Sequence, residues 1–377
     1  MKNYLKRYEI ELKVLGPVHI GSGEEIKKSE WIMDHGSVLV MDPRKLMQEL
    51  EQIHMLDQYV NDVVYERFSL WNWAKKQNVS MSVFHDSAAY ELDAAGVTRD
   101  DLNRRNIQAF IKDPYQKPYI PGSSLKGAVR NILLGMMIEQ KEYDVNNIKR
   151  TIDKFQGKRS KFLKQESETL EVSMFHTKIS DGTEVTDAVN DAMRGIRFSD
   201  SRPIPLDMLT LAQKVDVHTD GSDRNMPLVR ETLKPGTEVT FGMTIDQTET
   251  DISGDDILRA IDGFYTDYQT MFLKQCRYRD ADEELSLQGE HILFLGGGVG
   301  YPSKTVMNQL LRGDPERVCY VSRAIQTALT GGYETRDRTK EHRQDIGLGV
   351  SPRVVKMTEF DGQLLQMGAC NLKMREL

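Results

Sequence analysis

The stretch from residue 119 to 140, YIPGSSLKGAVRNILLGMMIEQ, decides the fold class of this chain. An extended approach ends in proline and glycine, and a helix with an apolar stripe at the i, i+3, i+4 spacing then follows. The stripe consists of Leu125, Ala128, Val129, Ile132, Leu133, Met136 and Met137. We expect Ser123 or Ser124 to cap the helix, and Lys126 and Arg130, one turn apart, to share its polar face. The stretch therefore predicts strands and helices that alternate along one chain.

Segments on both sides of this helix alternate with the period of two that is typical of strands. In residues 8–14, Tyr8, Ile10, Leu12 and Val14 share one face, and in residues 239–245 Val239, Phe241, Met243 and Ile245 do so. Hairpins are predicted at residues 34–36 and at residues 361–362, where Asp and Gly favour tight turns. The order lacks the regular βαβ repeat of a doubly wound sheet. We therefore predict an α+β fold with antiparallel sheets covered by helices.

Helix signals are clear at two further places. Asp42 and Pro43 suit the N-cap and first position of a helix, and Ser253 with Asp256 forms a capping box ahead of a wide apolar face. Residues 149–164 carry seven basic side chains and one acid, Asp153. Such a run predicts a solvated or mobile insertion, with contact to RNA as the alternative.

Composition narrows the class of protein. The 377 residues suffice for two or three domains or for one elaborated domain. A net charge of −7 argues against a protein coated in positive charge, although a local basic groove is compatible with it. The three cysteines are far apart and odd in number, so neither a disulfide scaffold nor a zinc knuckle is indicated. With no apolar signal core and no run of about 18 apolar residues, we predict a cytoplasmic protein without membrane contact.

Glycine-rich stretches recur in three places, as HIGSG at 19–23, PGSSLKG at 121–127 and GGGVGYPSKT at 296–305. Each puts glycines and small hydroxyl residues at the end of an extended segment, and the last two are expected to lead into helices. Glycine allows a close approach of the backbone, and a helix start offers N–H donors to anions. Each stretch alone would suit a tight turn, but three together favour a protein that lays its backbone against a phosphodiester chain.

The third stretch resembles a P-loop, which would make the chain an NTPase. A P-loop needs glycine immediately before its lysine, whereas Ser303 precedes Lys304 here and Pro302 has no N–H to donate. The NTPase hypothesis, under which Lys304→Ala removes nucleotide-dependent protection against unfolding, is therefore disfavoured.

A different enzyme class stays open. His19 and His35 lie beside predicted turns, where a metal-independent endoribonuclease could place a general base. Asp34 could ligate a metal at its hairpin tip, but turn chemistry alone also explains that aspartate. The sequence contains neither a zinc-protease HExxH motif nor a convincing pair of carboxylates.

Five stretches in this order, LGPVHIGSGEEI, YIPGSSLKGAVRNILL, IRFSDSRPI, VRETLKPGTEVTF and LGGGVGYPSKT, resemble the RAMP superfamily of repeat-associated proteins. The resemblance spans nearly the whole chain and is to the family of fifth subunits of the Csm complex, the type III-A CRISPR effector. It implies tandem RRM-like, ferredoxin-like folds with helical insertions and glycine-rich loops. An N-terminal domain over residues 1–190 and a C-terminal domain over residues 191–377 are expected.

The resemblance also implies a function. Such a subunit is non-catalytic, caps the backbone filament, binds the 3′ part of the guide RNA (crRNA) and supports its maturation by recruiting cellular ribonucleases. Its other partners would be the backbone RAMP subunit, the small helical subunit and, indirectly, target RNA. Neither a metal nor a cofactor is expected.

Carried over by motif, the expected RNA-binding residues are His19, Gly21, Ser22, Gly23, Ser123, Ser124, Lys126, Arg130, Gly296, Gly297, Gly298 and Lys304. Backbone N–H groups, hydroxyls and cations suit a partner whose phosphates and sugars are constant while its bases vary. On this hypothesis, Lys126→Ala or Arg130→Ala weakens guide capture without unfolding the chain. The alternative remains a metal-independent endoribonuclease that processes CRISPR repeat RNA.

Overall fold

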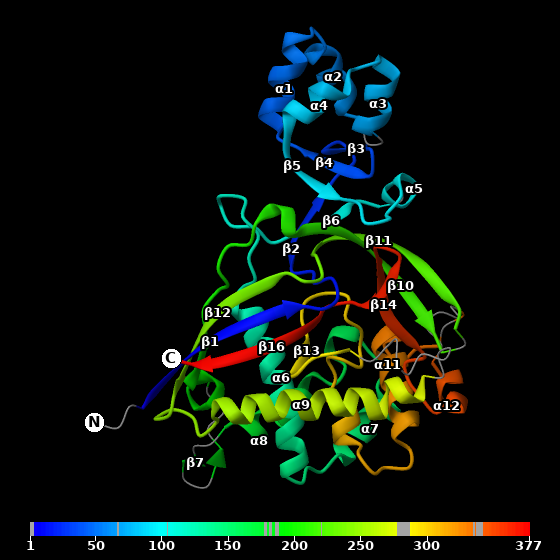
Figure 1. Cartoon of the computed structure of the whole chain (residues 1–377). Coiled ribbons are helices and arrows are strands. Elements are labelled where there is room, and N and C mark those ends of the chain that lie inside the picture. The colour runs from blue at the N-terminus through cyan, green and yellow to red at the C-terminus, as the bar shows by residue number, and fades with distance from the viewer. Residues whose placement is uncertain are drawn as a thin grey trace.

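The computed structural model describes residues 4–65, 68–103, 105–176, 179–180, 183–184, 188–219, 221–276, 287–334, 336 and 342–377. The predicted α+β class is confirmed, with covering helices and with sheets that are antiparallel apart from two parallel strand pairs (Figure 1).

One sheet is built from both ends of the chain. Its strand order is β13 (Ile292–Phe294), β16 (Ala369–Glu376), β1 (Leu5–Val14), β12 (Glu238–Asp246) and β9 (Ile196–Phe198), all in antiparallel pairs. Helices α6 (Gly122–Gln140) and α9 (Gly254–Met271) pack on it, and α9 runs along one side of the sheet in Figure 1. Along the chain, β1, α6, β9, β12, α9 and β16 follow the β-α-β-β-α-β order of a ferredoxin-like fold.

The predicted apolar faces form the core of this unit. Ile10, Leu12 and Val14 of β1 are each about 1% exposed, and Leu125 and Val129 of α6 pack in the same cluster. The α9 capping box is present, with the Ser253 and Asp256 side chains bonded reciprocally to backbone N–H groups.

A second, larger sheet adjoins the first. Its path is β2 (Gly21–Ile26), β6 (Ile107–Phe110), β11 (Asp223–Leu233), β10 (Leu209–His218), β5 (Ala88–Asp93), β4 (Ser37–Met41) and β3 (Trp31–Asp34). Strand β14 (Val354–Phe360) pairs with β10 and, through the predicted hairpin at residues 361–362, with β15 (Gln363–Gln366). Both sheets take strands from each side of the predicted domain border at 190/191.

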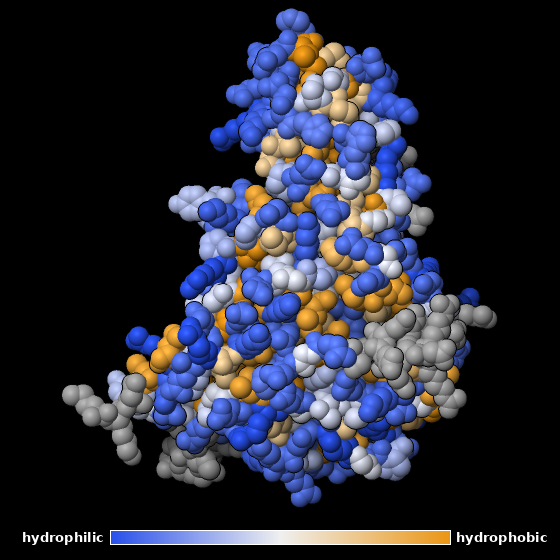
Figure 2. All heavy atoms as spheres, viewed as in Figure 1, coloured by the Kyte–Doolittle hydropathy of each residue, from blue (hydrophilic) through white to orange (hydrophobic). Residues whose placement is uncertain are grey.

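A helical lobe extends from the second sheet (Figure 1). It contains α1 (Pro43–Gln52), α2 (Leu56–Val63), α3 (Leu70–Gln77) and α4 (Met81–Ser87), packed on β3 and β4 around a separate apolar cluster. Asp42 caps α1 and Pro43 occupies its first position, as predicted. Figure 2 shows a mainly hydrophilic visible face with apolar residues also on this lobe. Exposed apolar residues there are Met47, Ile53, Val60, Val64 and Tyr65.

The remaining helices lie around the body. They are α5 (Arg99–Leu102), α7 (Asn146–Lys154), α8 (Lys164–Phe175), α10 (Met307–Leu310), α11 (Arg317–Thr330) and α12 (Gln344–Leu348), and the short strands β7 (Ile179–Ser180) and β8 (Thr183–Glu184) pair with each other. Within the described ranges, no helix has both the length and the apolar character needed to cross a bilayer.

The expected cap of α6 is wrong. The helix begins at Gly122, so Ser123 and Ser124 lie inside its first turn, and neither makes a capping hydrogen bond. The Gly122 N–H instead donates to the Asp200 carboxylate at 2.8 Å, from the segment that follows β9. A side chain at residue 122 would place its Cβ 2.4 Å from the Ser199 carbonyl oxygen, so only glycine permits this docking.

The basic run at 149–164 is solvated, as predicted, since six of its seven basic residues are exposed, but part of it packs on the body. Its first part belongs to α7, whose Ile148 and Ile152 are buried against Val321 and Ile325 of α11. These two isoleucines are four residues apart and so lie on the same face of α7, and their burial holds the helix against α11 although most neighbouring side chains are charged.

Candidate nucleic-acid interface

The first and third glycine-rich stretches are in direct contact. The Gly297 N–H donates to the His19 carbonyl oxygen at 2.8 Å. Gly296 has a φ of +85°, and a Cβ at that position would lie 2.2 Å from the same oxygen. Glycine is therefore required here for both its conformation and its size.

The second and third stretches border one cavity of about 380 Å³. Ser123, Gly127 and Asn131 line it from successive turns of α6, and Gly296 and Lys304 line it from the opposite loop. Among the described residues, the side chains of Ser123, Ser124 and Asn131 have no hydrogen-bond partner. Two hydroxyls and one amide are thus free to bind a polar ligand.

Lys304 closes the third loop on itself. Its Nζ donates to the Gly296 carbonyl oxygen at 2.6 Å, and burial lowers the pKa of its ammonium group. The loop does not lead directly into a helix as expected, because α10 begins only at Met307 and spans four residues. The third loop therefore places no helix N-terminus at its own end, and the helix start at this cavity is that of α6.

Lys126 and Arg130 have internal partners. Lys126 Nζ donates to the carbonyl oxygens of Met193 and Ile196 at 2.7 and 2.8 Å. Arg130 pairs with Glu171 and Asp191, both at 2.7 Å. Alanine at either position would remove contacts that hold α6 to its neighbours, so a stability cost is expected beside any loss of RNA binding. An RNA contact of either side chain stays a prediction.

His19 is buried beside the third loop. Its Nδ1 lies 2.7 Å from the Glu231 carbonyl oxygen, so this nitrogen carries the proton and donates. Burial lowers the pKa of His19 to about 4, and the nearby Arg230 adds to the effect. The ring is therefore neutral at pH 7. Gly21 lies next to Nε2, while Gly21, Ser22 and Gly23 themselves are exposed and do not line the cavity.

The depressed pKa of His19 predicts acid-sensitive stability. Because the folded pKa lies below the unfolded value of about 6.5, stability falls as pH drops through the window from 6.5 to 4. Between pH 7 and 4.5, His19 should account for a loss of about 2 kcal/mol in the free energy of unfolding. Urea denaturation of wild type and His19→Gln at both pH values measures this share. Equal pH dependence in the two proteins would contradict the assignment.

The other candidate base, His35, lies in the turn between β3 and β4 at the base of the helical lobe. Its Nδ1 is 2.8 Å from Asp34 Oδ1, and His85 Nε2 is 2.9 Å from Asp34 Oδ2. Hydrogen bonds from His85 and His35 lower the pKa of Asp34. No group of three or more metal-ligating side chains occurs in the part of the chain that the structure describes. Asp34 is thus held by two imidazoles in a turn.

Two functional candidates on β11 were missed by sequence reasoning. Glu231 is fully buried and accepts from Lys112 Nζ at 2.6 Å, from the Phe110 N–H at 2.7 Å and from the Tyr90 hydroxyl at 2.6 Å. Arg230 points to the other face of the sheet, toward Gly298. One signal in the sequence could have indicated these two residues. The stretch VRETL at 229–233 places an arginine next to a glutamate in a strand, where neighbouring side chains point to opposite faces of the sheet.

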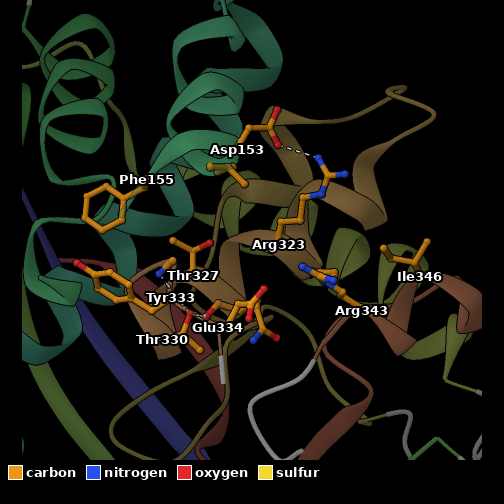
Figure 3. Close-up of a pocket in the computed structure, with 13 residues that line it drawn as sticks. Asp153, Phe155, Arg323, Thr327, Thr330, Tyr333, Glu334, Arg343 and Ile346 are labelled. Atoms are coloured by element: carbon orange, nitrogen blue, oxygen red, sulfur yellow. Dashed lines mark hydrogen bonds and ion pairs between the residues drawn. The ribbon is translucent and has the colours of Figure 1, made fainter. Parts of the chain in front are cut away.

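Another cavity, of about 820 Å³, lies between α7, α11 and α12 (Figure 3). Arg323 and Arg343 line it, and Arg323 pairs with Asp153 at 2.7 Å. None of the three glycine-rich stretches contributes to its lining. The cavity that joins two of those stretches is thus the better candidate for the site that the motifs predict.

A comparison with known proteins identifies the superfamily to which the chain belongs. The model of the RAMP superfamily matches residues 11–301, and the chain belongs to this superfamily. The particular likeness is to proteins named CRISPR system Cms protein Csm5. The chain is 28% identical to that of Mycobacterium tuberculosis (strain CDC 1551 / Oshkosh), covering 100% of this chain and 99% of the relative. It is 27% identical to that of Streptococcus thermophilus, covering 82% of each.

Solved structures agree on the fold. A chain in the cryo-EM structure of a Csm-crRNA-target RNA ternary complex of a type III-A CRISPR-Cas system aligns with a TM-score of 0.66 and 20% identity, covering 97% of this chain and 100% of that one. The crystal structure of T. onnurineus Csm5 aligns with a TM-score of 0.59 and 19% identity, covering 96% and 99%. At these identities the likeness shows the fold.

Proposed function

We propose that this chain is a non-catalytic RNA-binding subunit of a type III-A CRISPR Csm complex. It caps the backbone filament, binds the 3′ part of the crRNA and supports crRNA maturation and antiviral defence. The observation that carries the proposal is the convergence of the three glycine-rich stretches, which lie about 100 and 170 residues apart in sequence yet meet around one loop. The relatives' name, Csm5, supports the part of the proposal that assigns the chain to a Csm complex.

The chemistry of the cavity suits RNA better than a small metabolite. Its free groups are hydroxyls, an amide and backbone N–H groups, which bind phosphate and sugar without reading sequence. The affinity should consequently be largely independent of sequence and should fall as salt rises. A backbone RAMP subunit beside the cavity would complete the groove.

The proposal is tested by incubating the purified chain with end-labelled guide RNA, with and without magnesium and with the backbone neighbour. Native and denaturing gels are run from the same tubes. Intact RNA that shifts mainly when the neighbour is present supports the capping subunit. Cleavage that copurifies with this chain and disappears in His19→Ala or His35→Ala would replace the proposal with the endoribonuclease.

The free groups of α6 should contribute directly to RNA binding. The double variant Ser123→Ala/Asn131→Ala removes two unpartnered donors without breaking an internal hydrogen bond. At about 1 kcal/mol for each lost hydrogen bond, the Kd for guide RNA in the presence of the neighbour should rise about tenfold or more. Filter binding at fixed salt measures it.

The matched control for this variant is Thr266→Ala/Thr270→Ala, which removes two exposed hydroxyls that donate to carbonyls of their own helix, α9. It should leave the Kd unchanged. An equal rise in both double variants would assign the loss to something other than the cavity.

A further inference from the structure

A second hollow, here called the α6–α8 recess, adjoins the cavity that joins the second and third glycine-rich stretches. It has a volume of about 250 Å³ and is lined by residues of α6, α7, α8 and the segment 301–310. Asn131 and Lys304 line both the cavity and the recess. A ligand bound in the cavity can therefore extend into the recess.

The walls of the recess are mainly apolar. Leu134 of α6, Ile148 of α7 and Leu170 of α8 line it with buried side chains. Tyr301, in the third glycine-rich stretch, adds an aromatic ring to this lining. An apolar hollow with an aromatic wall binds a flat, uncharged ring well, because both surfaces leave water when the ring enters.

The charges at the recess make it unsuitable for a phosphate group. Glu166 and Glu171 both line it. Glu171 pairs with Arg130 at 2.7 Å, and Glu166 accepts a hydrogen bond from the Thr151 hydroxyl. Lys304, the cation among the described lining residues, donates to a carbonyl oxygen of its own loop. The two carboxylates would repel an anion, whereas an uncharged ring meets no such repulsion.

Two polar side chains at the recess are free to bind. Asn131 of α6 and the exposed Ser167 of α8 line it, and neither side chain has a hydrogen-bond partner among the described residues. A carboxamide and a hydroxyl can each donate or accept a hydrogen bond. They can therefore satisfy the edge of a nucleobase whatever its pattern of donors and acceptors, which suits a guide RNA whose bases vary.

We propose that the α6–α8 recess holds one unstacked nucleobase of a bound RNA strand, with the base against the Tyr301 ring and its edge at Asn131 and Ser167. The inference rests on the proposed function for the presence of RNA. Single-stranded RNA is commonly bound through bases that leave the stack and lie on aromatic side chains. Stacking of this kind tolerates every base, because every base has a π-face.

A scan with abasic nucleotides tests the recess in the unaltered protein. Each guide RNA in the set lacks one base and keeps every phosphate, and its Kd is measured with the backbone neighbour present. At one position the abasic guide should bind about fivefold or more weakly than the intact guide, because the stacking of one base is lost. The slope of log K against log salt should not change there, since no phosphate contact is removed. A scan in which no position matters would overturn the proposal.

Filling the recess should have the same effect as removing the base. Ser167→Trp places an indole at the recess and should raise the Kd of the intact guide about fivefold or more. In this variant the sensitive abasic guide and the intact guide should bind equally well. The matched control is Gln165→Trp, at an exposed residue of α8 that does not line the recess. It should behave as wild type, and equal losses in both tryptophan variants would contradict the base site.

The aromatic wall is tested at Tyr301. Tyr301→Leu should raise the Kd of the intact guide and reduce the effect of the abasic position, whereas Tyr301→Phe keeps the ring and should retain the wild-type Kd. Equal losses in the two variants would exclude stacking on this ring. Urea denaturation establishes that each variant is folded under the conditions of the binding assay.

The results separate the recess from the proposed function. If the wild-type chain binds no guide RNA even with its neighbour, the proposed function fails and the base site fails with it. If the intact guide binds but neither the abasic scan nor Ser167→Trp changes the Kd, the base site alone is overturned. A flat abasic scan together with weaker binding of the neighbour to Ser167→Trp in the absence of RNA would assign the recess to a side chain of that subunit instead.

Discussion

Alanine at Gly296 is expected to destabilise the protein by about 3 kcal/mol, through strain at positive φ together with a backbone clash. The residue has a φ of +85°, and its new Cβ would lie 2.2 Å from the His19 carbonyl oxygen. That oxygen also accepts from the Gly297 N–H, so the loop cannot move away without breaking the bond that joins the first and third glycine-rich stretches. Urea denaturation at pH 7 measures the loss, and RNA binding should fall with it.

The chain offers a matched control at Gly36. This glycine has the same φ of +85° in the turn between β3 and β4, but nothing lies within 4 Å of its Cβ position. Gly36→Ala should therefore show the conformational cost alone, about 1 kcal/mol. The difference in unfolding free energy between Gly296→Ala and Gly36→Ala gives the cost of the clash between the new Cβ and the His19 carbonyl oxygen. Equal losses would mean that the loop can open to admit a methyl group, against the packing described.

Glu231→Gln is expected to cost about 3 to 5 kcal/mol, because it leaves the Lys112 ammonium buried beside a neutral amide. The carboxylate is fully buried and the lysine side chain is 9% exposed. The same substitution weakens the acceptor for the Tyr90 hydroxyl and the Phe110 N–H. Adding Lys112→Met should recover part of the loss, since no unpaired charge then remains. A double-mutant cycle, with free energies of unfolding from urea denaturation, gives the coupling free energy between Glu231 and Lys112.

An exposed ion pair calibrates this experiment. Arg375 lies 2.8 Å from Glu9 in the first sheet, where both side chains are accessible to solvent. Glu9→Gln should change the free energy of unfolding by less than about 1 kcal/mol. If Glu231→Gln were equally mild, water would have to reach Lys112, and the burial of its side chain beside Glu231 would be contradicted.

The sequence predicted the local elements well where one physical signal dominated. The alternation in β1 and β12, the hairpins at residues 34–36 and 361–362, and the capping box of α9 are all confirmed. Each depends on neighbours within a few residues. The cap of α6 was predicted wrongly because its acceptor, Asp200, comes from 78 residues further along the chain.

For the candidate site, the sequence predicted which loops take part but not the contacts of their side chains, because those contacts also join residues far apart in the sequence. Small residues marked the loops, but nothing in the PGSSLKG stretch showed that Lys126 would donate to carbonyl oxygens of residues 193 and 196. Arg230 was missed because the sequence alone does not show which side of β11 is covered by the third glycine-rich loop. Only the sheet reveals that the Arg230 and Glu231 side chains occupy opposite faces.

The pairing of β1 with β16 has a consequence for how the protein is made. Tyr8 is aligned with Glu376, so the central strand of the ferredoxin-like sheet lacks this neighbour until the residues up to 376 have been synthesised. Closing so long a loop is slow, and until then β1 presents an open edge to other nascent chains. Shortened translation products that end before residue 369 would keep that edge open, and would be removed by proteases or aggregate rather than enter an assembly.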